Sequence, residues 1–253
     1  MRYLYIFFLL LYLPSCSGKA SIKPVEVFDA EKSFAEANEL ASNDEYEKAR
    51  AILTRIKNSD TSKKYAPLSQ LRIADTYVRE DEPDLAVAEY RKFIGMYPGH
   101  RYAPYAQYQI AMIYFNQIES PERGYSGAAK ALAEFEKLKR DYRRNPYRDI
   151  INIRIEKCRN IMADYEFLVG EFYLKKESYK AAIGRFETLI KTFPDYRKMP
   201  QVLLNLGVAH RKSGQKEKAA EYLNRLLKNY PNSSLVPYAE KELASLKAGQ
   251  KRR

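Results

Sequence analysis

The stretch DYEFLVGEFYLKKESYKAAIGRFETLIKTFP, residues 164–194, predicts two amphipathic helices joined by a short polar turn. Its apolar residues recur three and four positions apart, which places them on one face of each helix. The turn falls at Glu177 and Ser178, and a proline ends the second helix. The small residues Gly170 and Ala182 are typical of antiparallel helices whose backbones come close together.

The same arrangement recurs through the chain at a regular interval. Small residues of the first helices stand at Ala37, Ala74, Ala111, Gly170 and Gly207. The intervals are 37, 37, 59 and 37 residues, so one period carries an insertion of 22 residues. A repeat of this length predicts a solenoid, because each hairpin buries its apolar face against the next one. We therefore expect an all-α, right-handed solenoid of five helical hairpins.

The second hairpin resembles a tetratricopeptide repeat. Its small, aromatic and proline positions match that repeat at Ala74, Tyr77, Ala86, Tyr90 and Pro98. The chain has no tryptophan, and its interval exceeds the ~34 residues that are usual for this repeat. We attribute the additional residues to longer helices or longer turns.

The 22 inserted residues fall in two places. Eight lengthen the turn within the third hairpin, and the other 14 lie between Ala131 and Gly170. The second group predicts one long helix at 147–176, between repeats three and four. Repeats one to three then occupy residues 28–146, and residues 147–253 hold the long helix, repeats four and five and a capping helix.

Two finer expectations concern helix ends. Asp44 is predicted to cap the second helix of repeat one, with Glu47 as its capping-box partner. The final capping helix is expected over residues 241–253.

The N-terminus predicts an export signal. An apolar run of 11 residues, 3–13, follows Met1 and Arg2, and a membrane-spanning helix needs ~20 apolar residues. Residues 13–16, Leu-Pro-Ser-Cys, resemble a bacterial lipobox, which predicts a signal peptide at 1–15, a lipidated Cys16 and a tether at 16–27. The alternative is an ordinary signal peptide that contains a cysteine. Cys158 is expected to be a buried helical residue.

Composition and motifs argue against catalysis and nucleic-acid binding. The net charge is +12, but Lys and Arg alternate with Asp and Glu as on solvated helix faces, apart from basic clusters at 139–148 and 251–253. His100 and His210 lack metal-ligand neighbours, and no phosphate-binding loop is present. We expect a protein that is not an enzyme and that has no metal or cofactor.

Three segments carry a resemblance to a known family. They are YPGHRYAPYAQYQIAMIYFNQ (97–117), AAKALAEFEKL (128–138) and EFLVGEFYLKKESYKAAIGRFETLIKTFP (166–194). Together with the repeats and the lipobox, they resemble the BamD family of outer-membrane assembly lipoproteins, also called ComL or YfiO. The resemblance implies a lipid-anchored scaffold of the β-barrel assembly (BAM) complex, on the periplasmic face of the outer membrane of a Gram-negative bacterium.

The resemblance also implies partners and sites. The C-terminal repeats would contact the membrane-proximal POTRA domain of a BamA-like barrel subunit, and we assign Tyr196, Arg197 and Lys198 to this surface by region. The N-terminal repeats would bind unfolded outer-membrane proteins, and other lipoproteins of the complex are further candidate partners.

First-helix residues line the groove of a repeat array, and aromatic and Met side chains there suit an extended apolar peptide. The predicted groove residues are Phe34, Asn38, Leu71, Asp75, Arg79, Tyr105, Tyr108, Met112 and Phe115. Arg79 is the candidate ligand of a chain-terminal carboxylate. The alternative is that Tyr105, Tyr108 and Phe115 only pack between repeats.

Two other functional classes stay open at this point. One is a periplasmic repeat protein that coordinates cell division. The other is a repeat lipoprotein of pilus or secretin biogenesis.

Overall fold

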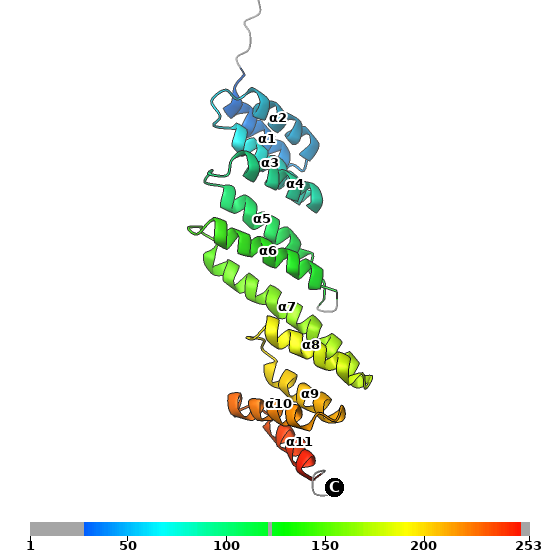
Figure 1. Ribbon diagram of the computed structural model, residues 1–253. Helices are drawn as coiled ribbons and strands as arrows, with labels where there is room; N and C mark the ends of the chain where they lie inside the picture. Colours follow the sequence, from blue (N-terminus) through cyan, green and yellow to red (C-terminus); the bar gives the residue numbers. More distant parts are fainter. Residues whose placement is uncertain (1–27, 121–122, 249–253) are drawn as a thin grey trace, which may run out of the picture.

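The computed structural model describes residues 28–120 and 123–248, which form an elongated stack of helices (Figure 1). No strand occurs in this part of the chain. The helices are α1 Ala30–Ser42, α2 Tyr46–Ser59, α3 Ala66–Arg79, α4 Pro83–Met96, α5 Ala103–Asn116, α6 Tyr125–Asp141, α7 Arg148–Lys175, α8 Tyr179–Thr192, α9 Met199–Lys212, α10 Lys216–Asn229 and α11 Val236–Ala248.

Consecutive helices pair as hairpins, as predicted. The pairs α1/α2, α3/α4, α5/α6, α7/α8 and α9/α10 are each in contact, and α11 packs on α9 and α10 at the end. Each hairpin also contacts the first helix of the next one. The prediction of a tetratricopeptide-like solenoid of five hairpins is confirmed.

The small residues stand where the two helices of a hairpin come closest. Ala37, Ala74 and Ala111 have no exposed surface. A Cβ atom added at Gly170 lies 2.5 Å from Phe186 Cε1, and one added at Gly207 lies 2.5 Å from Leu223 Cδ2. The large partner of each glycine therefore stands 16 positions further along the chain, and a side chain at the glycine has no room.

A polar clamp joins the two helices of several hairpins. The residue four positions before the small residue is a buried glutamine in repeats two and three. Gln70 Nε2 donates to the Glu89 backbone carbonyl oxygen at 3.2 Å, and Gln107 Nε2 donates to that of Glu134 at 3.2 Å. In repeat four Glu166 takes this position and pairs with an arginine of α8. These bonds satisfy polar groups that the packing buries.

The long helix α7 spans Arg148–Lys175, which is 28 residues, and the sequence predicted a helix at 147–176. It contacts α6 on one side and α8 on the other. One hydrophobic cluster continues past α7 and includes buried residues from Ala111 on α5 to Leu246 on α11. Cys158 is fully buried in that cluster, as expected.

Two finer predictions were wrong. Asp44 does not cap α2: it has a φ of 62°, and the N-cap is Glu45, which makes no side-chain capping bond. The chain needs a left-handed residue to reverse direction there, and Asp tolerates that conformation. The last helix begins at Val236, five residues before the expected start, because the turn at 230–235 has the same length as the other turns between repeats.

The predicted signal peptide, Cys16 and the tether lie outside the described residues. Within the described ranges, none of the helices combines the length and the apolar character that crossing a bilayer requires.

Candidate functional site

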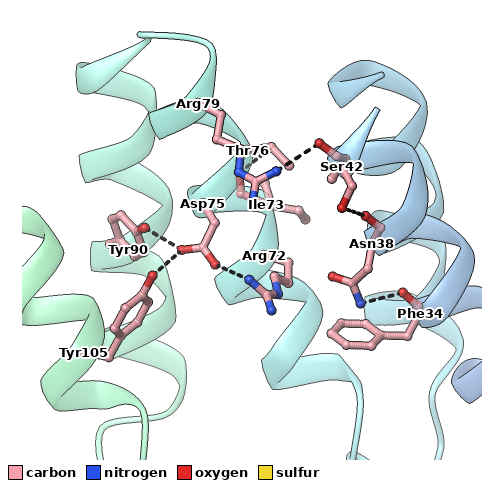
Figure 2. A network of polar contacts seen from close by, with 11 residues as sticks. Phe34, Asn38, Ser42, Arg72, Ile73, Asp75, Thr76, Arg79, Tyr90 and Tyr105 are labelled. Atoms are coloured by element: carbon pink, nitrogen blue, oxygen red, sulfur yellow. Dashed lines mark hydrogen bonds and ion pairs between the residues drawn. The ribbon is translucent and has the colours of Figure 1, made fainter. Parts of the chain in front are cut away.

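A polar network centred on Asp75 joins three helices of the N-terminal repeats (Figure 2). Tyr90 on α4 donates its hydroxyl proton to Asp75 Oδ1 at 2.6 Å, and Tyr105 on α5 donates to the same oxygen at 3.1 Å. Arg72 Nη1 lies 3.1 Å from Asp75 Oδ2. The carboxylate therefore ties α3 to the next helix of its own repeat and to the first helix of repeat three.

Local sequence places this carboxylate. Asp75 directly follows the fully buried Ala74, so it stands at the border of the packed face of α3. Burial raises the pKa of Asp75, and the hydrogen bonds from Tyr90, Arg72 and Tyr105 only partly oppose that effect. Burial and the adjacent carboxylate raise the pKa of Tyr105 to about 12, so its hydroxyl stays a proton donor.

A cavity of about 150 Å³ lies between α1 and α3, beside this network. Its lining comes almost entirely from first helices: Ala37, Asn38, Ala41, Ser42, Leu53, Arg72, Asp75, Thr76 and Arg79. Arg79 reaches across it and donates from Nη1 to the Ala41 carbonyl oxygen at 3.1 Å. Two guanidinium groups therefore stand at a hollow on the predicted groove face, and such groups bind carboxylates.

The other predicted groove residues divide into partly buried and buried ones. Tyr105, Tyr108 and Met112 are partly buried, whereas Leu71 and Phe115 are 7% and 8% exposed. Phe115 packs edge-on against Phe135 of α6 at 6.1 Å, in the cluster between repeats. Leu71 and Phe115 therefore offer a ligand almost no surface.

Tyr108 has a second partner that its sequence does not reveal. Its ring stacks on Tyr147 with a centroid distance of 4.3 Å and an interplanar angle of 7°. Tyr147 is the N-cap residue of α7, so the stack fixes the start of the long helix against α5. Phe34 packs against Tyr65 at 5.5 Å, and Asn38 Nδ2 donates to the Phe34 carbonyl oxygen at 2.8 Å.

The predicted docking residues meet at a second buried carboxylate, Asp164 of α7. Tyr196 donates its hydroxyl proton to Asp164 Oδ1 at 2.6 Å, Arg197 Nη2 lies 2.6 Å from Oδ2, and Lys198 Nζ lies 3.1 Å from Oδ1. Tyr196 is 4% exposed, so its ring belongs to the core. The side chains of Arg197 and Lys198 are 61% and 45% exposed and form the surface there.

Burial opposes ionisation of Asp164, but its hydrogen bonds outweigh burial. The bonds from Tyr196, Arg197 and Lys198 hold the pKa of Asp164 below its usual value of 3.8. The carboxylate is ionised at neutral pH and offsets part of the positive charge of the turn at 193–198.

Three residues of these networks were not predicted as site residues. Arg72 and Tyr90 belong to the first network, and Asp164 organises the second. The available signal was the position of Asp75 and Asp164 on otherwise packed helix faces, because a buried carboxylate requires partners.

The histidines serve packing. His210 is 1% exposed, and its ring stacks on Tyr222 with a centroid distance of 5.3 Å. The His210 Nδ1 atom lies 3.0 Å from Gln215 Oε1. In the ranges 28–120 and 123–248 no group of three or more His, Cys, Asp or Glu side chains is arranged to hold a metal ion.

Residues 28–226 match a family model, YfiO, which is described as an outer membrane lipoprotein. The outer membrane protein assembly factor BamD of Neisseria meningitidis serogroup A is 25% identical over 243 residues, which cover 90% of this chain and 91% of that protein. BamD of Caulobacter vibrioides is 26% identical over 219 residues, covering 85% of this chain and 72% of its own. BamD of Rickettsia prowazekii is 25% identical over 229 residues, covering 90% and 91%.

Among solved structures, the TPR2AB domain of yeast Sti1 in a complex with pHSP90 covers 88% of this chain and 84% of its own. Its sequence identity is 15% and its TM-score is 0.45.

Proposed function

This chain belongs to the YfiO family of outer membrane lipoproteins, and from that membership we propose that it is a non-enzymatic scaffold for outer membrane protein assembly. Similar proteins in three genera carry the name of such an assembly factor and match most of their length. The cell-division and pilus-biogenesis alternatives lose support, because the matched family and relatives are assembly proteins.

The anchor is part of the proposal. Cys16 is the acylated first residue of the mature chain, and it holds the protein at the periplasmic face of the outer membrane. Residues 1–15 are the signal peptide and 16–27 the tether.

The N-terminal repeats bind an unfolded client through its C-terminal segment. The observation that carries this proposal is the cavity between α1 and α3 with Arg72 and Arg79 at its edge. A guanidinium group of this pair binds the terminal carboxylate of the client. The partly buried rings of Tyr105 and Tyr108 then hold its apolar residues.

A peptide-binding measurement tests this site. A fluorescent peptide with an aromatic C-terminal residue is titrated with the wild-type chain and with Arg72→Ala/Arg79→Ala. We expect affinity to fall about tenfold or more, because each lost charged contact contributes roughly 1.5–3 kcal/mol. Amidation of the peptide terminus should weaken wild-type binding to a similar extent and the double variant little.

Arg91→Ala is the matched control. Arg91 lies on α4, pairs with Glu134 and is 56% exposed, and it does not line the cavity. Equal affinity of the double variant, the control and the wild type, with folding intact, would exclude the cavity as the client site.

The C-terminal repeats dock on the barrel subunit through Arg197 and Lys198. These side chains are exposed, while Tyr196 and Asp164 fix the turn that presents them. Arg197→Glu should reduce copurification of the barrel subunit from solubilised outer membrane. Lys212→Glu, an exposed reversal at the C-terminus of α9, is the control. Normal copurification of the Arg197 variant would count against this surface.

A further inference from the structure

The antiparallel hairpins sort all their connecting turns onto two opposite edges of the stack. Turns between repeats lie on one edge, the left side of Figure 1, and turns within repeats lie on the other. The first edge holds residues 60–65, 97–102, 142–147, 193–198 and 230–235. The second holds residues 43–45, 80–82, 117–124, 176–178 and 213–215, of which 121–122 lie outside the described residues.

The two edges carry opposite charge. The turns between repeats hold the basic residues Lys63, Lys64, Arg101, Arg143, Arg144, Arg197 and Lys198, against the acidic residues Asp60 and Asp195. The described turns within repeats hold the acidic residues Asp44, Glu45, Glu80, Asp81, Glu82, Glu119 and Glu177, against the basic residues Arg123 and Lys176. We call the first the basic edge and the second the acidic edge.

Helix dipoles do not account for this separation. A basic residue is favoured at a helix C-terminus and an acidic one at an N-terminus. Every turn on either edge joins the C-terminus of one helix to the N-terminus of the next. Both edges therefore present equal numbers of positive and negative helix ends, and helix stability gives neither edge a preferred sign.

Contacts within the chain neutralise some basic residues of the basic edge and leave others without an acidic partner. The carboxylate of Asp60 accepts from the backbone N–H groups of Tyr65 and Ala66, at 2.6 and 2.9 Å. Arg197 and Lys198 share Asp164. In the part of the chain that the structure describes, Lys63, Arg143 and Arg144 are exposed and form no ion pair. The free positive charge thus concentrates on the turns before α3 and α7.

Arg101 adds a further positive charge on the turn at 97–102, which lies between the turns before α3 and α7. Its guanidinium group lies over the ring of Tyr102 at 4.7 Å, a contact that orders the side chain and leaves its charge unneutralised. Lys139 and Arg148 flank the turn at 142–147, so positive charge is densest there.

We propose that the basic edge binds an anionic lipid surface. Its free side chains are long and exposed, belong to successive repeats and do not line the cavity between α1 and α3, so they fit a flat surface with spread charge better than one ligand. The acidic edge is repelled from such a surface, which sets the side of the stack that faces it. The proposal deepens the proposed function and rests on it: attachment at Cys16 alone does not set which side of the stack faces the membrane, and the basic edge does.

Vesicle binding tests the edge without the anchor. The chain from residue 17 keeps all the helices that the structure describes, since the first of them begins at Ala30. It is sedimented with phosphatidylethanolamine vesicles that either contain or lack phosphatidylglycerol. We expect binding to the anionic vesicles only, weakening as salt rises. Arg143→Glu/Arg144→Glu should bind at least about 30-fold more weakly, because each basic residue near the surface contributes about fivefold and the two new carboxylates are repelled as well.

Arg123→Glu/Lys176→Glu is the matched control, since it makes the same change in net charge on the acidic edge. It should bind the anionic vesicles like the wild type. Equal losses in the two variants would overturn the proposal, because binding would follow net charge. Capture of polyglutamate through the basic edge without vesicle binding would also overturn it and assign the edge to an acidic protein.

The client peptide separates this proposal from the proposed function. Arg143→Glu/Arg144→Glu should keep the wild-type affinity for the client peptide, because the turn at 142–147 does not line the cavity between α1 and α3. Vesicle binding that survives in Arg72→Ala/Arg79→Ala supports the edge even where peptide binding fails.

Discussion

Gly170 on α7 lies directly against the aromatic ring of Phe186 on α8, with an added Cβ atom only 2.5 Å from Phe186 Cε1. Gly170→Ala therefore forces the ring or the helix to move. Overpacking of this kind costs about 1–3 kcal/mol, and better helix propensity offsets only part of it. We expect a lower urea midpoint with an unchanged slope.

Gly184→Ala gives the opposite result at a matched position. Gly184 lies within α8, and nothing stands within 4 Å of a Cβ atom added there. The substitution should raise the free energy of unfolding by about 0.5–1 kcal/mol through helix propensity alone. If both alanine variants raise the midpoint, the tight contact at Gly170 does not exist in solution.

Glu177→Gly should stabilise the hairpin of repeat four. Glu177 has a φ of 58°, a conformation that costs a residue with a Cβ atom about 1–2 kcal/mol. Glycine removes that cost and loses some backbone entropy, so we expect a net gain of about 0.5–1 kcal/mol in thermal or urea unfolding. Ser178→Gly is the control. Ser178 has a φ of −79°, so glycine there adds the backbone entropy cost without removing any strain, and the variant should be less stable.

The Asp164 network predicts the dependence of stability on pH in acid. The pKa of Asp164 in the folded chain is lower than its usual value of 3.8. The stabilisation by ionised Asp164 is therefore complete above pH 3.8 and is lost as the pH falls through the pKa of the folded chain. Asp164→Asn should lose about 1–2 kcal/mol at neutral pH. The difference from wild type should shrink as urea titrations move below pH 4. A constant difference down to the acid limit would contradict the network.

Cys158 should be unreactive in the folded protein. It is fully buried, and burial raises the pKa of its thiol to about 11, so little thiolate exists at neutral pH. In a chain from residue 17, Cys158 is the only cysteine. A thiol reagent such as Ellman's reagent should react fully in urea and very slowly without it. Rapid reaction under native conditions would show that α7 opens locally.

The sequence predicted the helices well because one rule governs every repeat. Small residues mark where two helices approach, and a fixed interval of 37 residues makes the rule visible without any other protein. The inserted helix followed from counting, since its 14 additional residues had no other place.

The side-chain networks could not be predicted in the same way. Asp164 and Tyr196 are 32 positions apart, and only the packing of α7 on the next turn brings them together. Tyr196 seemed suited to a surface and is buried. Phe115 is on a first helix, but the rotation of α5 turns it toward α6. Periodicity tells which face is apolar and does not tell which neighbour covers it.

The long helix α7 has a mechanical consequence. It contacts α6 and α8 as a single uninterrupted rod, roughly 42 Å long at 1.5 Å per residue. The Tyr108–Tyr147 stack clamps its beginning, and the Gly170–Phe186 contact clamps its far portion. A bend between the N-terminal and the C-terminal repeats would consequently have to deform this rod or break one of the two contacts that hold its ends.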